Sequence, residues 1–242
     1  MPGASALMML SLLATDTVEV PHPVPREQIG AVLGQPIYRD QLRKKFPVRD
    51  ELFRLIEPAL QKYQEQHRKQ IEPTDAELTF AADAFRRENP EHWREQDAEW
   101  KADLAEIRAL VADPDFAKLP ADERKAAAIR QRHLETSDAA RDFARFILDS
   151  RKFNRHLYET FGGGRIVWQQ GGVEAFDAHH RWLGSLEKRG DFSFADQELR
   201  AIFYEYWTNE RQHRSFLSTP EKNPERIEEF LNPEWFPAEA AK

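Results

Sequence analysis

The sequence predicts a mainly α-helical, multi-helix domain that opens with a small β-hairpin. Three observations support this fold class. Glycine is scarce, with 10 residues in a chain of 242. Apolar residues recur at steps of three and four over most of the chain, which is the helical period. Strand-like runs are confined to residues 29–38 and 165–170.

The hairpin is expected within Ile29 to Leu42, which reads IGAVLGQPIYRDQL. Two short apolar runs flank the dipeptide Leu33-Gly34, and a two-residue turn at this point would let them pair as antiparallel strands. A charged helical start follows directly. The chain is therefore expected to enter its helices through a short strand pair.

The first helices are expected between residues 50 and 88. Residues 50–70 carry apolar side chains at helical spacing, and Pro58 inside this run is expected to kink or divide the helix. Thr74 followed three residues later by Glu77 forms a capping box, which predicts a helix from there to about Glu88.

A long helix is expected after Asn89 and Pro90, because asparagine is a good N-cap and proline fits the first helical position. It should end at Asp113. Its apolar stripe consists of Trp93, Trp100, Leu104, Ile107 and Val111.

Two further helices are expected at residues 121–135 and from Thr136 or Ser137 to the glycines 162–164. The apolar side of the second comprises Phe143, Phe146, Ile147, Phe153, Leu157 and Phe161. After a strand at 165–170, helices are expected near 173–188 and 196–209. We divide the chain into a leader and linker (1–25), an N-terminal region (26–113) and a C-terminal helical region (114–242), which could pack with the N-terminal one as a single domain.

The formal net charge of -7 argues against a nucleic-acid partner, because such proteins present a basic face to phosphate. The chain has no cysteine, which excludes disulfides, thiol nucleophiles and cysteine-based zinc sites. The apolar run Ala6–Ala14 has the length of a signal-peptide core and is too short to span a bilayer. An exported, periplasmic protein is expected, with a cytoplasmic one as the alternative, since no basic residue precedes the run.

Two motifs are similar to those of phosphate-binding loops and metal sites. The segment FGGGR (161–165) lacks the Lys-Ser/Thr of a phosphate loop and follows a helix, so we interpret it as a helix C-cap with left-handed backbone. The segment DAHH (177–180) and Glu210 with His213 have spacings found in metal sites, but a di-iron bundle needs more ligands than the sequence offers. No cofactor is therefore expected, and the weak metal candidates are His156, His179, His180 and His213.

The N-terminal third resembles the SurA-type N-terminal domain that accompanies periplasmic parvulin-type peptidyl-prolyl isomerases and related chaperones. The match covers about residues 29–90. The residues that carry it are Val32, Gly34, Pro36, Ile37, Leu42, Leu60, Ile71, Thr74, Asp75, Glu77 and Leu78. The sequence departs from the family pattern at Leu33 and Tyr38, and a complete parvulin domain is not recognisable.

The resemblance implies a fold like the peptide-binding parts of SurA and trigger factor. It also implies a chaperone module that binds unfolded or extended client segments. Aromatic residues that a single helix stripe does not require are candidates for the binding groove: Phe46, Tyr63, Phe80, Phe85, Trp93 and Trp100. Two alternatives remain open: a degenerate or unrecognised peptidyl-prolyl cis-trans isomerase, and a metal-binding helical protein. The client and the oligomeric state stay undefined by the sequence.

Overall fold

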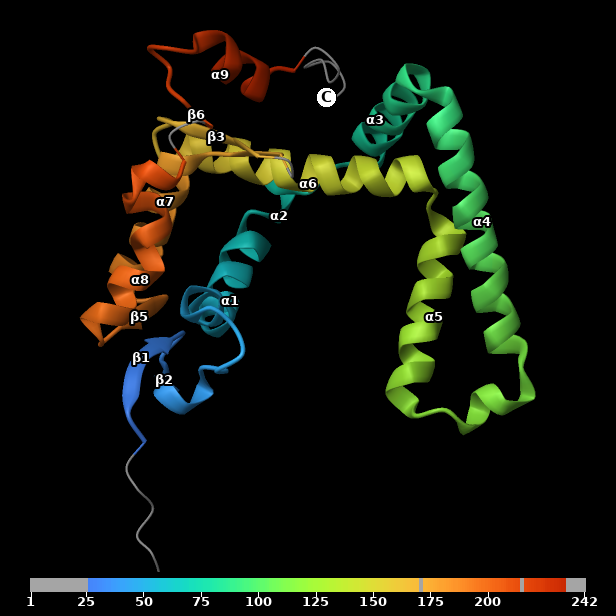
Figure 1. Cartoon of the computed structure of the whole chain (residues 1–242), viewed down its shortest axis with the longest axis horizontal. Coiled ribbons are helices and arrows are strands. Elements are labelled where there is room, and N and C mark those ends of the chain that lie inside the picture. The colour runs from blue at the N-terminus through green and yellow to red at the C-terminus, as the bar shows by residue number, and fades with distance from the viewer. Residues whose placement is uncertain (1–25, 170–171, 214–215, 234–242) are drawn as a thin grey trace, which may run out of the picture.

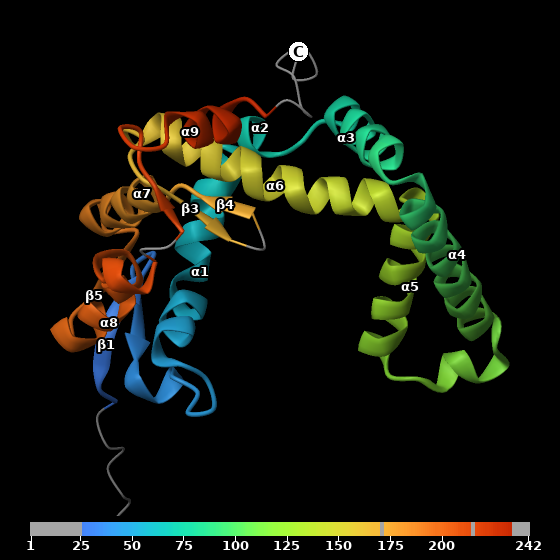
Figure 2. The ribbon, with the colours of Figure 1, turned by 45° about the horizontal axis from the view of Figure 1, so that its top comes forward.

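The computed structural model describes residues 26–169, 172–213 and 216–233. Its helices form an arch (Figures 1 and 2). The long helix α6 (Ala139–Thr160) is the span, and two limbs extend from it to the same side. One limb, called the body, combines the first and the last described parts of the chain. The other limb, called the arm, is the hairpin of α4 (Pro90–Ala112) and α5 (Ala121–Thr136). The expected mainly helical fold with an N-terminal strand pair is confirmed.

The strand pair lies in the body. Strands β1 (Gln28–Val32) and β2 (Gln35–Tyr38) pair in antiparallel register around Leu33 and Gly34, whose φ angles are 47° and 78°. Two consecutive left-handed residues are the signature of a type I′ hairpin turn. A short 3₁₀ turn, η1 (Arg39–Gln41), then leads toward the first helix.

A third strand completes this sheet. Strand β5 (Phe192–Phe194) pairs antiparallel with β1, which gives the order β2-β1-β5. The two backbones approach so closely that a Cβ added at Gly30 would lie 2.1 Å from the carbonyl oxygen of Ser193. The sequence prediction did not include β5, whose pairing partner lies far away in the chain.

The body core packs α1 (Val48–Gln66), α7 (Phe176–Arg189) and α8 (Gln197–Thr208) against this sheet. Trp182, Phe176 and Phe203 are fully enclosed. Helix α1 runs unbroken past Pro58, so the expectation that proline would divide it is wrong. Pro58 lies on the exposed side of α1, away from the buried positions. A short helix, α2 (Arg68–Ile71), follows.

The second sheet lies beside α6. Strands β3 (Ile166–Gln169), β4 (Gly172–Glu174) and β6 (Leu217–Ser218) form it in the order β4-β3-β6, and α9 (Pro224–Leu231) follows. Between α8 and β6 lies the short turn η3 (Glu210–Gln212). Glycines 162–164 all have positive φ angles, as expected for a helix C-cap. The expected strand at 165–170 matches β3.

Helix α3 (Asp75–Glu88) packs along α6 near the arm. The capping box of Thr74 and Glu77 starts it, as predicted. The contact is made by small residues, since Ala81 and Ala82 meet Ala140 and Ala144. Phe143 and Phe146 were expected on the apolar side of α6 together with its buried residues. In the structure, 42% of the surface of Phe143 and 58% of that of Phe146 are exposed. Because the alanines let α3 and α6 approach closely on one face of α6, the large rings of Phe143 and Phe146 lie outside that contact.

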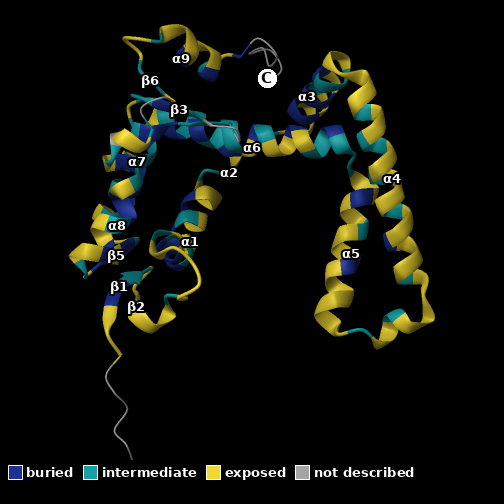
Figure 3. Ribbon diagram, viewed as in Figure 1, coloured by how far each residue is buried: buried dark blue, intermediate teal, exposed yellow. Residues whose placement is uncertain are grey.

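The arm has a sparse core. Among the described residues, the buried cluster between α4 and α5 consists of Ile107, Ala127 and Leu134, with Trp100 and Val111 partly covered. The turn η2 (Pro114–Lys118) connects the two helices, so the expected division after residue 113 falls within this hairpin. Figure 3 shows most of the arm as exposed surface. Among the described helices, none combines the length and hydropathy needed to cross a bilayer.

Candidate functional site

A partly exposed aromatic cluster lies where the arm meets the span. Phe85 of α3, Trp93 of α4 and Phe143 of α6 contact one another, with ring centroids 5.2 Å (Phe85–Phe143), 5.5 Å (Trp93–Phe143) and 6.3 Å (Phe85–Trp93) apart. Such edge and tilted contacts stabilise the cluster beyond simple burial. Three helices therefore converge to hold these rings in a fixed arrangement.

A surface hollow of about 600 Å³ opens beside this cluster. We call it the arm hollow. It is formed by α4 and the first turns of α6, and its lining residues are His92, Trp93, Gln96, Glu99, Trp100, Asp103, Ala139, Asp142, Phe143 and Phe146. Monomeric proteins rarely expose several large apolar side chains in one place without a binding role. The hollow is therefore the leading candidate for a binding site.

The floor of the arm hollow is held rigidly. The indole Nε1 of Trp100 donates a hydrogen bond to the carbonyl oxygen of Leu134 at 3.2 Å, which fixes its ring between α4 and α5. His133 lies edge-on to Trp100, with centroids 5.4 Å apart. A ligand at this position would therefore meet a preformed surface.

The rim of the arm hollow is acidic. Asp103 pairs with Arg130 at 2.9 Å, and Asp142 lies 3.0 Å from Nε2 of His133. Glu99 accepts a long hydrogen bond of 3.4 Å from the Gln96 amide. The lining residues include three carboxylates and no lysine or arginine. The hollow thus combines aromatic walls with a carboxylate-bearing edge, on which Asp103 and Asp142 have basic partners.

The six groove candidates from the sequence separate into two groups. Phe85, Trp93 and Trp100 come together at the arm hollow, and Phe80 is partly buried in the neighbouring α3–α6 contact. Tyr63 is 3% exposed in the body core and donates to or accepts from Nε2 of His156 at 2.9 Å. Phe46 is 50% exposed on the body, beneath the Arg43 guanidinium. Tyr63 and Phe46 therefore do not contribute to this surface.

Phe143 and Phe146 were not among the sequence candidates. The available signal was the spacing of Ala140, Ala144 and Leu148, which marks the face of α6 that a neighbouring helix can approach. Large residues off that face are then free to meet solvent. Their side chains form the outer wall of the arm hollow.

The weak metal candidates do not converge. Within the described ranges, no group of three or more His, Asp or Glu side chains is arranged to hold a metal ion. His156 contacts Tyr63, and His179 stacks on Trp207 with ring centroids 5.1 Å apart. His180 also stacks over Trp207, and His213 lies against Tyr206.

Asp177, the acidic member of the DAHH segment, has a structural role. It accepts hydrogen bonds from the Arg165 backbone N–H at 2.7 Å and from the Arg165 guanidinium at 2.8 Å. Burial opposes ionisation of Asp177, but the hydrogen bonds from Arg165 outweigh it and lower the pKa of the carboxyl. The pair fastens the glycine turn to α7.

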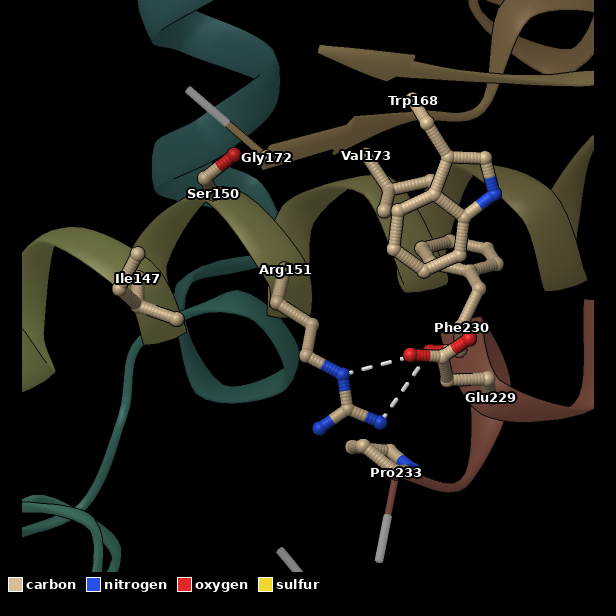
Figure 4. A pocket seen from close by; sticks show the side chains of 9 residues that line it. All are labelled: Ile147, Ser150, Arg151, Trp168, Gly172, Val173, Glu229, Phe230 and Pro233. Atoms are coloured by element: carbon tan, nitrogen blue, oxygen red, sulfur yellow. Dashed lines mark hydrogen bonds between the residues drawn. The ribbon is translucent and has the colours of Figure 1, made fainter. Parts of the chain in front are cut away.

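A more enclosed apolar cavity of about 160 Å³ lies between α6, the β3–β4 hairpin and α9 (Figure 4). Arg151 points from α6 toward α9 and donates to the carbonyl oxygens of Phe230 and Leu231. Burial lowers the pKa of Arg151 to about 10. Because this guanidinium caps the last carbonyls of α9, we interpret the cavity as a seam that fastens the helix.

No protein-family model, curated protein or solved structure was found to match this chain. The SurA-type resemblance therefore rests on the residues quoted for it alone.

Proposed function

We propose that this protein is a SurA-like chaperone module that captures unfolded or extended polypeptide segments at the arm hollow. One observation carries the proposal: Phe143 and Phe146 are exposed beside Trp93 and Trp100 in a hollow with an acidic rim. The mechanism is reversible capture of apolar client side chains, which lowers the concentration of free, aggregation-prone chains.

Energetics favour weak, reversible binding. Full burial of one large apolar client side chain contributes about 1.5–3 kcal/mol. Association costs several kcal/mol in lost freedom of motion, so a single anchored ring gives no stable complex. Clients that present several apolar residues, as unfolded chains do, would be retained, whereas folded proteins that bury such residues would not.

The arch supports the proposal geometrically. Both limbs extend to one side of α6 (Figure 2), and the arm hollow lies where one of them, the arm, meets α6. The arm is a thin two-helix hairpin with much surface for its mass. This is the arrangement expected of a protein that surrounds a client rather than of one that encloses a small substrate.

The test is suppression of client aggregation. A reduced, unfolded client is followed by light scattering at substoichiometric to equimolar ratios of the full chain. We expect suppression that saturates near a fixed ratio and that weakens severalfold in Phe146→Ala and Phe143→Ala. The matched control is Ile129→Ala on α5, since Ile129 is 61% exposed but lies outside the hollow. Equal suppression by all three variants would overturn the assignment.

A proline-limited refolding assay separates capture from the isomerase alternative. Uncatalysed proline isomerisation takes tens of seconds and is easily timed. Capture leaves the rate constant of the slow phase unchanged or lowers its amplitude. An isomerase would raise the rate constant in proportion to its concentration.

The proposed compartment is the bacterial envelope, on the strength of the apolar run Ala6–Ala14, which lies outside the described residues. Fractionation of cells expressing the full chain tests this, with recovery in the cytoplasmic fraction as the contrary result.

A further inference from the structure

A second surface hollow, of about 690 Å³, lies near the middle of the span, between α1, α2 and α6. We call it the body hollow. Its lining residues are Pro58, Gln61, Lys62, Gln64, Glu65, Arg68, Ile71, Glu72, Asp149 and Phe153. Nothing in the capture mechanism described above uses it.

The two hollows share one face of α6. Ala140, Ala144 and Leu148 face α3. Asp142, Phe146, Asp149 and Phe153 follow one another at steps of four, three and four residues, which places them on a single stripe on the opposite side of the helix. Asp142 and Phe146 line the arm hollow, whereas Asp149 and Phe153 line the body hollow. The stripe therefore connects the two sites.

The stripe alternates acidic and aromatic side chains. Phe146 is exposed, and Phe153 is held edge-on against Trp182 with ring centroids 5.3 Å apart. Asp142 is paired with His133, but Asp149 forms no ion pair within the described ranges. A polypeptide lying along this face would thus meet an apolar position followed by a carboxylate that has no direct ion-pair partner in the described ranges.

The cations of the body hollow are already engaged. Lys62 pairs with Asp191 at 2.8 Å, and Arg68 pairs with Glu72 at 2.7 Å. Partial burial raises the pKa of Asp149, and Glu72 adds to this rise, whereas Arg145 and Lys152 oppose it without reversing it. Lys152 is itself paired with Glu77 at 2.8 Å. A carboxylate whose charged form is destabilised in this way gains from an incoming cation. Charge complementarity therefore selects a basic client group at Asp149.

We propose that the two hollows form one continuous binding track for an extended client segment that places an apolar side chain in the arm hollow and a lysine or arginine at Asp149. The track rests on the proposed chaperone function and defines its preferred client. The centres of the two sites on α6 are about seven residues apart, or roughly 10 Å along the axis. Three residues of a client segment in the polyproline II conformation, at about 3.1 Å each, span that distance, and its three-residue turn places side chains three positions apart on the same side. The preferred pattern is thus an aromatic or large apolar residue and a basic residue three positions apart.

Fluorescently labelled ten-residue peptides test this by anisotropy with the full chain at low salt. One set carries phenylalanine and lysine three positions apart, in both orders. Matched peptides replace the lysine by glutamine or glutamate, or change the separation to one or seven. We expect replacement of the lysine by glutamine to weaken binding about threefold, the size of an exposed ion pair, and 0.5 M salt to remove the difference.

A double-mutant cycle assigns the preference to Asp149. In Asp149→Asn the lysine and glutamine peptides should bind equally, whereas Glu88→Gln, on the α3 side of α6, should keep the threefold difference. Phe146→Ala should weaken both peptides together. If the lysine preference survives in Asp149→Asn, or if spacing has no effect, the track is overturned while capture at the arm hollow stands.

Two further results would also overturn the track. If no peptide binds and aggregation is not suppressed, the proposed function fails as well. If no peptide binds but sedimentation shows self-association that Phe146→Ala abolishes, the stripe is an interface between two copies of this chain, and the track is likewise overturned.

Discussion

The Lys152 ammonium on α6 lies 2.8 Å from the carboxylate of Glu77, the residue that completes the capping box of α3. Glu77 is almost fully buried and also accepts a hydrogen bond from the Thr74 backbone N–H at 2.6 Å. One side chain therefore both starts α3 and ties it to the span. This connection holds α3, and with it Phe85, in place beside the arm hollow.

Glu77→Gln should lower the free energy of unfolding by about 2 kcal/mol, because glutamine can keep the reciprocal cap but leaves a partly buried lysine unpaired. Hydrogen bonds from Lys152 and Thr74 outweigh the burial that opposes ionisation, so the pKa of Glu77 is lowered in the folded state. Its contribution is therefore present above the ordinary value of 4.5 and is lost as pH falls below it. Urea denaturation of both proteins at pH 7 and pH 3 measures this.

The control for that change is Asp75→Asn. Asp75 begins the same helix and pairs with Arg141 at 2.7 Å, but its side chain is 92% exposed. Exposed pairs contribute little, so its loss should cost less than about 1 kcal/mol. An equal cost for both substitutions would contradict the anchoring role of Glu77.

Gly30→Ala should destabilise the protein by about 3 kcal/mol, because the added methyl group would meet the backbone oxygen of Ser193. The strands β1 and β5 would have to separate. Gly184→Ala is the matched control: nothing lies within 4 Å of its Cβ position on α7, so the same substitution should stabilise by about 0.5–1 kcal/mol. Thermal denaturation followed by circular dichroism distinguishes the two, and equal shifts in Tm would refute the close approach.

Tyr63→Phe should cost about 1 kcal/mol of stability by removing the hydrogen bond to His156. Client capture should not change, since Tyr63 lies in the core of the body and lines neither hollow. Aggregation suppression and urea denaturation on the same preparation give both quantities. A loss of capture with unchanged stability would return Tyr63 to the binding surface.

Glu51 should make the entry to α1 sensitive to acid. Its carboxylate receives the guanidinium of Arg43 at 2.6 Å and that of Arg54 at 2.8 Å, and these lower the pKa of Glu51 to about 2. Because the folded-state pKa is below the ordinary value of 4.5, the stabilisation is complete above pH 4.5 and declines as pH falls toward 2. The stability difference between the wild type and Glu51→Gln should shrink over this window. A difference independent of pH would show that the arginines act only through packing.

Local signals predicted the elements that depend on neighbouring residues. The turn at Leu33-Gly34, the capping box at Thr74 and the Asn89-Pro90 helix start are each decided within a few residues, and the structure contains all three. Strand β5 was missed because Phe192–Phe194 becomes a strand only through pairing with β1.

The candidate site was predicted only in part, because some of its features depend on contacts between helices that are far apart in the sequence. Trp93 and Trp100 stand out because a charged helix seldom needs two tryptophans. The exposure of Phe143 and Phe146 depends on which face of α6 receives α3, and alanines decide this through helix–helix distance rather than through hydrophobicity. From amphipathic spacing alone, the rings of Phe143 and Phe146 are predicted to lie in the core.

The order of the sheet β2-β1-β5 affects how the chain can fold as it is synthesised. Strand β1 is made early, yet its second partner is Phe192–Phe194, and the core between them also needs α7 and α8. Closing so long a loop is slow compared with forming a local hairpin such as α4–α5. The arm is therefore expected to form before β5 has been synthesised and can pair with β1. During that interval the nascent protein exposes the same kind of apolar segment that its finished form is proposed to capture.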